Sequence, residues 1–261
     1  KIIEAKNFFI QAMEKGNTRA IYEYAKLLLL TNKNESMKFF QEAVRKGSKE
    51  AMYKYGSILN NDEGIELIKQ SAKKNYSKAL YYYYKKFPNQ VNSLEYLKKA
   101  ADKCHIQSMH EYGLLMLNNE NGLKEEELLR HLKKASDNGN IDSMYEYGKV
   151  IIEGNKNVQS NPKNGSKYIR ISANNGHTDA MGYYGKLLLE GKGVAINYKE
   201  AIIYLIKGIE KGSGIAMNSY GYAFEYGLGV PLNYEEANKY YKMAIDKGIT
   251  EAMINHAWML W

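Results

Sequence analysis

The feature that most constrains the fold is a small residue that returns at nearly constant spacing along the whole chain. The intervals between successive copies are 31, 28, 29, 35, 37, 36 and 36 residues. A repeat of this length matches one pair of helices, and such units bury their apolar surface by stacking on their neighbours. The sequence therefore predicts an all-α chain, an α-solenoid of about eight antiparallel helix-pair repeats. The anchoring small residues are Ala20, Ala51, Ala79, Ser108, Ser143, Ala180, Ala216 and Ala252.

The anchor lies in the first helix of each repeat. In the sixth repeat, Ala180, Met181, Tyr184 and Leu187 fall on one stripe with the 3.6-residue period of a helix. Glycine recurs five residues after many anchors, although glycine inside a helix costs about 0.8–1 kcal/mol relative to alanine. We interpret this glycine as a packing requirement, which lets a neighbouring helix approach closely. It stands at Gly56, Gly113, Gly148, Gly185 and Gly221.

The second helix of each repeat is predicted over segments such as 198–212 and 234–248, and a similar segment opens the chain at 3–16. Each segment ends on glycine, which suits a left-handed C-terminal cap. Asn197 and Asn233 are placed to cap the helix starts. Sustained alternation typical of strands is absent, and the tyrosine run 81–84 fits the first-helix frame of the third repeat.

The length differences between repeats fall in the turn inside each repeat. This turn is long at 190–198 and 226–234 and contracts to stretches such as 31–34, where a change of length is thermodynamically cheap. The chain opens on a second helix and closes on a first helix. We therefore expect residues 1–261 to form a single repeat domain and the native polypeptide to continue past Trp261.

Composition narrows the classes of function. The net charge is +8, and the first 100 residues carry 19 Lys and Arg against 10 Asp and Glu. Only four of the 37 bases are Arg, the usual residue for reading phosphates and bases, so we do not expect a nucleic-acid partner. The longest apolar run, 27–30, is far short of a membrane span. The lone Cys104 is interpreted as a small core residue, and a single cysteine indicates a reducing compartment, hence the cytoplasm.

The two most regular repeats carry a family resemblance. Segments 180–212 and 216–248 follow the pattern Ala-Met-x-x-Tyr-Gly-x-x-x-x-x-Gly-x-Gly-Val, followed by Asn-Tyr-x-x-Ala. This pattern resembles the Sel-1-like repeat, a relative of the tetratricopeptide repeat, and it extends over essentially the whole chain. The early repeats depart from it: Ala25 and Tyr84 replace the glycine, and the Gly-x-Gly turn is missing. The cysteine pairs of the secreted bacterial members are also absent.

The resemblance implies a right-handed superhelix that acts as an adaptor for other macromolecules. By analogy with the tetratricopeptide frame, the positions two and six residues after each anchor should point into a groove lined by the first helices. Tyrosine offers rigid contact area and lysine attracts acids, so these columns predict a surface for an extended peptide. The other interpretation is that tyrosine is simply abundant and lysine covers a solvated face. The predicted partner-binding residues are Tyr22, Lys26, Tyr53, Tyr81, Lys85, His110, Tyr145, Lys149, Lys186, Tyr222 and Trp258.

No arrangement typical of catalysis, metal binding or cofactor binding can be placed from the sequence. The five histidines lack the spacing of metal ligands. The Gly-Lys-Gly at 191–193 follows a predicted helix rather than a strand, so it is interpreted as a turn and not as a phosphate loop. We therefore expect no enzyme activity, no metal and no cofactor.

These observations favour a scaffold that binds proteins or peptides. Two alternatives stay open. One is an anionic-ligand binder, for nucleic acid or phosphoinositide, working through the basic first third of the chain. The other is a regulatory repeat segment of a kinase-like protein.

Overall fold

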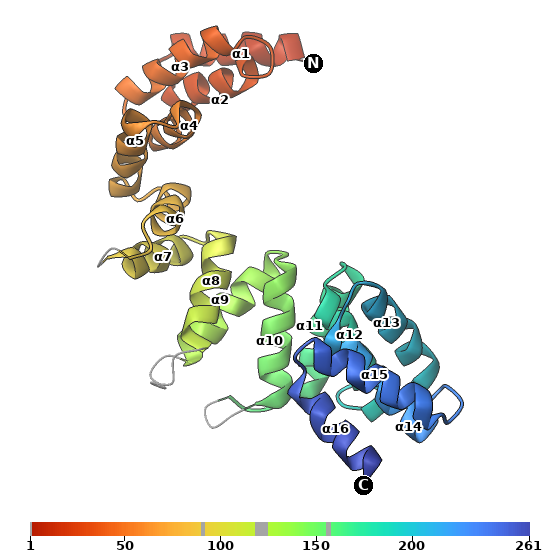
Figure 1. The fold of residues 1–261 in the computed structure, drawn as a ribbon. Coiled ribbons are helices and arrows are strands. Elements are labelled where there is room, and N and C mark those ends of the chain that lie inside the picture. The colour runs from red at the N-terminus through yellow and green to blue at the C-terminus, as the bar shows by residue number, and fades with distance from the viewer. Residues whose placement is uncertain (1, 90–91, 118–124, 155–157) are drawn as a thin grey trace. The chain divides into compact units, whose positions relative to one another are not determined.

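The computed structural model describes residues 2–89, 92–117, 125–154 and 158–261. Across these ranges it contains sixteen α-helices and no strand (Figure 1). None of these helices is both long enough and apolar enough to cross a membrane. In chain order they are α1 (Ile2–Glu14), α2 (Thr18–Leu28), α3 (Lys33–Arg45), α4 (Lys49–Leu59), α5 (Asp62–Lys73), α6 (Ser77–Lys86), α7 (Ser93–Asp102), α8 (Ile106–Leu117), α9 (Glu125–Asp137), α10 (Ile141–Glu153), α11 (Pro162–Asn174), α12 (Thr178–Glu190), α13 (Tyr198–Glu210), α14 (Gly214–Tyr226), α15 (Tyr234–Asp246) and α16 (Thr250–Leu260).

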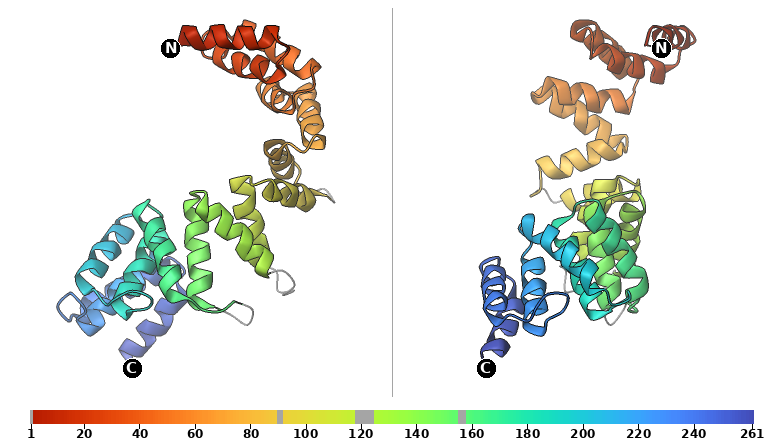
Figure 2. Two further views of the ribbon diagram at one scale, coloured as in Figure 1. Left: turned by 180° about the vertical axis from the view of Figure 1, so that it is seen from behind. Right: turned by 90° about the vertical axis from the view of Figure 1, so that its right-hand side faces the viewer.

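The helices alternate as the repeat predicts. Every anchoring small residue lies in an even-numbered helix, and we call these the A helices and the odd-numbered ones the B helices. Each of the A helices α2, α4, α6, α10, α12 and α14 packs on the B helix that follows it, and α12 also packs directly on α14. Figures 1 and 2 show consecutive helices running back and forth. The prediction of an all-helical solenoid of helix pairs is confirmed.

The chain divides into two compact units. The first unit comprises residues 1–109 and the second residues 110–261. The first contains α1 to α7, the second contains α9 to α16, and α8 crosses the boundary.

Helix starts are fixed by side-chain caps that the sequence makes possible. Asn197 accepts a hydrogen bond from the backbone N–H of Glu200, and Asn233 accepts one from that of Glu236, as predicted. Ser48 and Asn140 cap α4 and α10 in the same way. Such a cap satisfies a backbone donor that has no partner inside the helix and stabilises the helix by about 1 kcal/mol.

Most B helices end on a residue with positive φ. Gly212 and Gly248 adopt φ of +84° and +80°, the left-handed conformation that glycine accepts without strain. Cys104 occupies the same place after α7 with φ of +58°, and it is exposed. The prediction that Cys104 fills the core is therefore wrong, because the repeat uses this position to leave the helix rather than to pack it.

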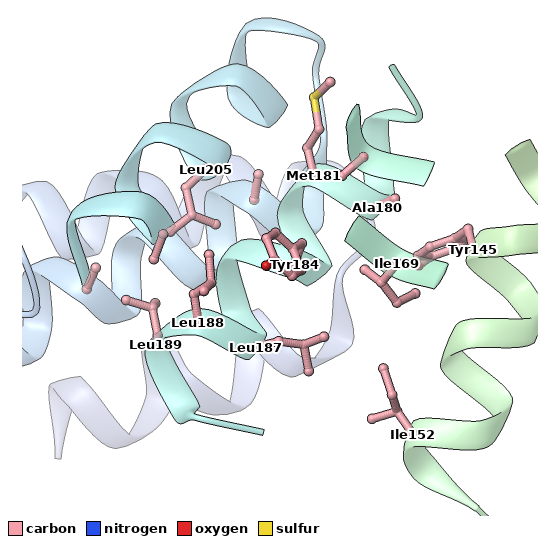
Figure 3. Close-up of a cluster of buried hydrophobic side chains, with 14 residues drawn as sticks. Tyr145, Ile152, Ile169, Ala180, Met181, Tyr184, Leu187, Leu188, Leu189 and Leu205 are labelled. Carbon is pink, nitrogen blue, oxygen red and sulfur yellow. The ribbon is translucent and has the colours of Figure 1, made fainter. Parts of the chain in front are cut away.

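The glycines inside the A helices lie where another helix approaches closely. A Cβ on Gly185 would come 2.6 Å from Cδ2 of Leu205, which is fully buried in α13. Figure 3 shows Leu205 beside Tyr184 and Leu188 in the apolar cluster of the second unit. The same cluster includes Ile152 of α10 and Ile169 of α11. The interpretation of these glycines as packing residues is supported by this lack of space.

Candidate partner-binding face

One stripe of the A helices carries all eleven predicted binding residues. It comprises the positions −1, +2, +3, +6 and +10 relative to the anchor, which the helical period places on one side. Within each unit, we call these stripes together the A-helix face.

Hydrogen bonds join neighbouring A helices along this face in the second unit. The Tyr183 hydroxyl donates to Glu153 at 3.1 Å, from α12 to α10. The Asn255 amide donates to Asn218 at 3.1 Å, from α16 to α14. These contacts fix the spacing of successive repeats by polar groups as well as by apolar packing.

One ion pair on the A-helix face skips a repeat. Lys186 Nζ of α12 lies 2.6 Å from Glu251 of α16, although α14 separates these two helices in sequence. Side chains two repeats apart can meet only if the face curves inward across α14. The A-helix face of the second unit is therefore concave at this point.

A pocket of about 110 Å³ lies at this concave point. It brings together the predicted Lys186 and Tyr222, each six residues after its anchor. The lining residues are Lys186, Leu189, Glu190, Asn218, Ser219, Tyr222, Glu251 and Asn255.

The electrostatics of the pocket are set by two carboxylates and one ammonium. Lys186 pairs closely with Glu251, whereas Glu190 lies 3.9 Å from the same Nζ. Partial burial raises the pKa of Glu190 above its ordinary value, and the nearby Lys186 and Lys192 only partly offset that effect. Because two carboxylates and one ammonium line the pocket, it has an excess of negative charge.

A second, larger hollow of about 600 Å³ lies on the first unit. The predicted Tyr22 lines this hollow. Burial raises the pKa of its hydroxyl, and the nearby negative charges of Glu23 and Glu50 raise it further. Burial likewise raises the pKa of Tyr76 to about 12. The lining residues are Thr18, Arg19, Tyr22, Glu23, Lys46, Gly47, Ser48, Glu50 and Tyr76.

The other predicted residues of the first unit do not line this hollow, but two of them contact residues that do. Tyr53 is half-buried, and its ring contacts Tyr76 at 5.6 Å between centroids. Lys26 Nζ lies 5.3 Å above the ring of Tyr22 and 2.7 Å from Glu23. Two more predicted residues lie on α6: Tyr81 is half-buried, with its ring 4.8 Å from that of His105, and Lys85 is exposed.

Three predicted residues of the second unit lie together away from the pocket. His110 is buried, and its Nδ1 lies 2.9 Å from the Ser143 hydroxyl. Tyr145 is also buried and stacks on His177, with Lys149 Nζ 5.2 Å above its ring. Burial lowers the pKa of His110 and raises that of Tyr145. His110 and Tyr145 thus make intramolecular contacts between repeats and offer little surface to a partner.

The predicted Trp258 lies on α16 and is 66% exposed. Its ring contacts that of Trp261 at 5.8 Å between centroids. It does not belong to the lining of the pocket.

Several residues of the pocket were not among those predicted from the sequence. Glu251 precedes its anchor by one residue, Ser219 and Asn255 follow theirs by three, and Glu190 follows by ten. The two columns considered at +2 and +6 cover only part of the stripe. The helical period extends it to −1, +3 and +10, and this signal could have located the acidic residues.

The fold and this face define a helical-repeat protein, and comparison with known families identifies the repeat. The Sel1 repeat model matches residues 20–48, 49–85, 86–103, 141–177, 178–213 and 214–249, which amount to more than half of the chain. The chain belongs to the Sel1 repeat family, as its resemblance predicted. No curated protein sequence matches the chain significantly.

Two crystal structures share the fold. A protective antigen of uropathogenic Escherichia coli with an SLR fold aligns with a TM-score of 0.68 at 19% identity, over 97% of this chain. The chain spans 59% of the length of that protein. A Sel1 repeat protein from Oxalobacter formigenes aligns with a TM-score of 0.61 at 17% identity, over 92% of this chain and 96% of the other. At these identities the likeness shows the fold alone.

Proposed function

We propose that this chain is a non-enzymatic scaffold that holds an extended segment of a partner protein on its A-helix face. The observation that carries the proposal is the ion pair between Lys186 and Glu251. This pair indicates that the face of the second unit is concave, and both of its residues line a polar pocket. A concave face with a pocket can surround a bound chain and remove more of its surface from water than a flat face can.

The side chains of the face suit a peptide ligand. Tyrosines such as Tyr22 and Tyr222 combine a rigid apolar ring with a hydroxyl, the composition enriched at protein interfaces. The half-buried Asn255 also lines the pocket, and the polar groups of its amide match those of a peptide backbone. The Sel1 repeat is a protein-interaction fold, which agrees with this assignment.

A displayed library of random 12-residue peptides, selected on the immobilised chain, tests this proposal. We expect peptides to be enriched that lose binding when Tyr222 is changed to Ala or when Tyr22 is changed to Ala, according to the unit they occupy. The control is Ile203→Ala, which alters an exposed apolar residue of the B helix α13 and should leave binding unchanged. Enriched peptides that depend on Ile203 and on neither tyrosine would place binding on the other side of the solenoid.

A further inference from the structure

The pocket formed by α12, α14 and α16 has more negative charge than its own lysine can neutralise. The Lys186 ammonium is already held by Glu251 at 2.6 Å. Glu190, with 40% of its side chain exposed, has Lys186 Nζ at 3.9 Å as its one ion-pair partner among the described residues. That separation exceeds hydrogen-bond distance, so the Glu190 carboxylate has no donor of its own from this lysine.

A second, independent feature of the pocket points to a missing polar partner. Ser219 lines the pocket and is 3% exposed, and its hydroxyl oxygen has no hydrogen-bond partner in the part of the chain that the structure describes. A buried hydroxyl without a partner is destabilising by about 1–3 kcal/mol, and most native structures avoid it. This oxygen is enclosed by the protein, and a rotation of the Ser219 side chain would bring it to a ligand group with N–H donors.

We propose that the pocket receives a cationic side chain, arginine or lysine, of the partner segment. This inference rests on the proposed function and specifies the chemical class of the residue that the partner inserts. The Glu190 carboxylate neutralises the incoming charge at the mouth of the pocket. The Ser219 hydroxyl accepts one of its N–H donors, and the ring of Tyr222 supplies a face for the cation. The volume of about 110 Å³ leaves room for the end of one side chain.

Charge complementarity excludes an acidic side chain as the favoured occupant. A carboxylate entering the pocket would meet Glu190 and Glu251 with one lysine between them, and like charges at this distance repel. The rise in the pKa of Glu190 caused by burial shows that even its own charge is only partly compensated.

The test is a titration of the 15N-labelled chain, followed by amide chemical shifts, with three small probes. These are the Nα-acetyl, N-methylamide derivatives of arginine, lysine and citrulline, the last being the neutral isostere of arginine. We expect saturable shifts at residues 218–222 with the arginine or the lysine probe in the millimolar range, and none with citrulline. The relative affinity of the first two probes distinguishes a guanidinium from an ammonium ligand.

Two variants of equal charge make the test specific. Glu190→Gln should weaken binding of the cationic probe about fivefold or more, whereas Asp246→Asn, an exposed acid of the B helix α15, should leave it unchanged. Equal shifts with citrulline, an unchanged affinity in Glu190→Gln, or no saturable shift with any probe would overturn the inference. If the cation test fails but library-selected peptides still depend on Tyr222 or Tyr22, the scaffold proposal stands and only the cation pocket is overturned. If the peptides depend on neither tyrosine, the scaffold proposal and the cation pocket both fail.

Discussion

Two glycines of α12 allow the packing of the solenoid to be measured with one substitution each. A Cβ on Gly182 would lie 2.5 Å from the backbone nitrogen of Ala216 and 3.0 Å from its Cα, at the start of α14. A Cβ on Gly185 would lie 2.6 Å from Cδ2 of Leu205, the end of a side chain in α13. The first contact is with rigid backbone of the next repeat, and the second is with side-chain atoms, Cδ2 and Cγ of Leu205, which can shift more easily than backbone.

The expected magnitudes follow from this difference. Replacing glycine by alanine in a helix gains about 0.8–1 kcal/mol of intrinsic stability. Overpacking costs about 1–3 kcal/mol, and the upper end applies where backbone blocks the new methyl group. We therefore expect Gly182→Ala to lower the free energy of unfolding by about 2 kcal/mol and Gly185→Ala to lower it by about 1 kcal/mol or less.

Urea unfolding followed by far-UV circular dichroism measures both changes. With a slope of about 2–3 kcal/mol per molar urea, Gly182→Ala should move the midpoint down by roughly 0.7–1 M, at least twice the effect of Gly185→Ala. A Gly182→Ala protein as stable as the parent chain would refute the reasoning, because α12 and α14 would then not need their close approach. A larger loss for Gly185→Ala would refute the distinction between backbone and side-chain contacts.

Three further predictions follow from single positions. Cys104→Gly should raise the urea midpoint by the equivalent of about 0.5–1 kcal/mol, because φ of +58° strains cysteine. The control Asn75→Gly, at φ of +57°, should change the midpoint little, since asparagine tolerates this conformation. Equal effects of the two substitutions would contradict this prediction. Burial holds the pKa of His110 below its unfolded value near 6.5, so its contribution to stability should be full above pH 6.5 and be lost as the pH falls through the lowered pKa. The urea midpoints at pH 7 and pH 5 should therefore differ less in His110→Asn than in the parent chain. An equal difference in both proteins would exclude His110 as the cause. Ser36→Ala should lose about 1–2 kcal/mol, because the buried hydroxyl donates to a backbone carbonyl of α2 at 2.6 Å; thermal unfolding checks this, and an unchanged midpoint would show that the bond contributes nothing.

The helix pairs could be predicted because their determinants are local and periodic. Asparagine before a helix start and glycine after a helix end satisfy backbone groups that the neighbouring few residues expose, as Asn197 and Gly212 illustrate. Such signals need no knowledge of distant contacts. Cys104 was misinterpreted because the sequence around it lacks glycine, so the position did not stand out as a helix end.

The candidate site could be predicted only in part because it depends on which repeats meet. The columns at +2 and +6 identified Lys186 and Tyr222 from the period of one helix. The ion pair between Lys186 and Glu251 depends on the curvature across α14, which no single repeat encodes. In the same way, the burial of His110 and Tyr145 depends on contacts with the following repeat. The positions +2 and +6 within one repeat give no information about these contacts.

The central claim is that a partner segment lies on the A-helix face, and photo-cross-linking tests it most directly. A peptide selected on the chain, carrying one benzoylphenylalanine, is irradiated in the complex, and the attachment site is located by mass spectrometry. We predict attachment to A helices: α12, α14 or α16 for a peptide that depends on Tyr222, and α2 or α4 for one that depends on Tyr22. Attachment confined to B helices such as α13 and α15 would contradict the account.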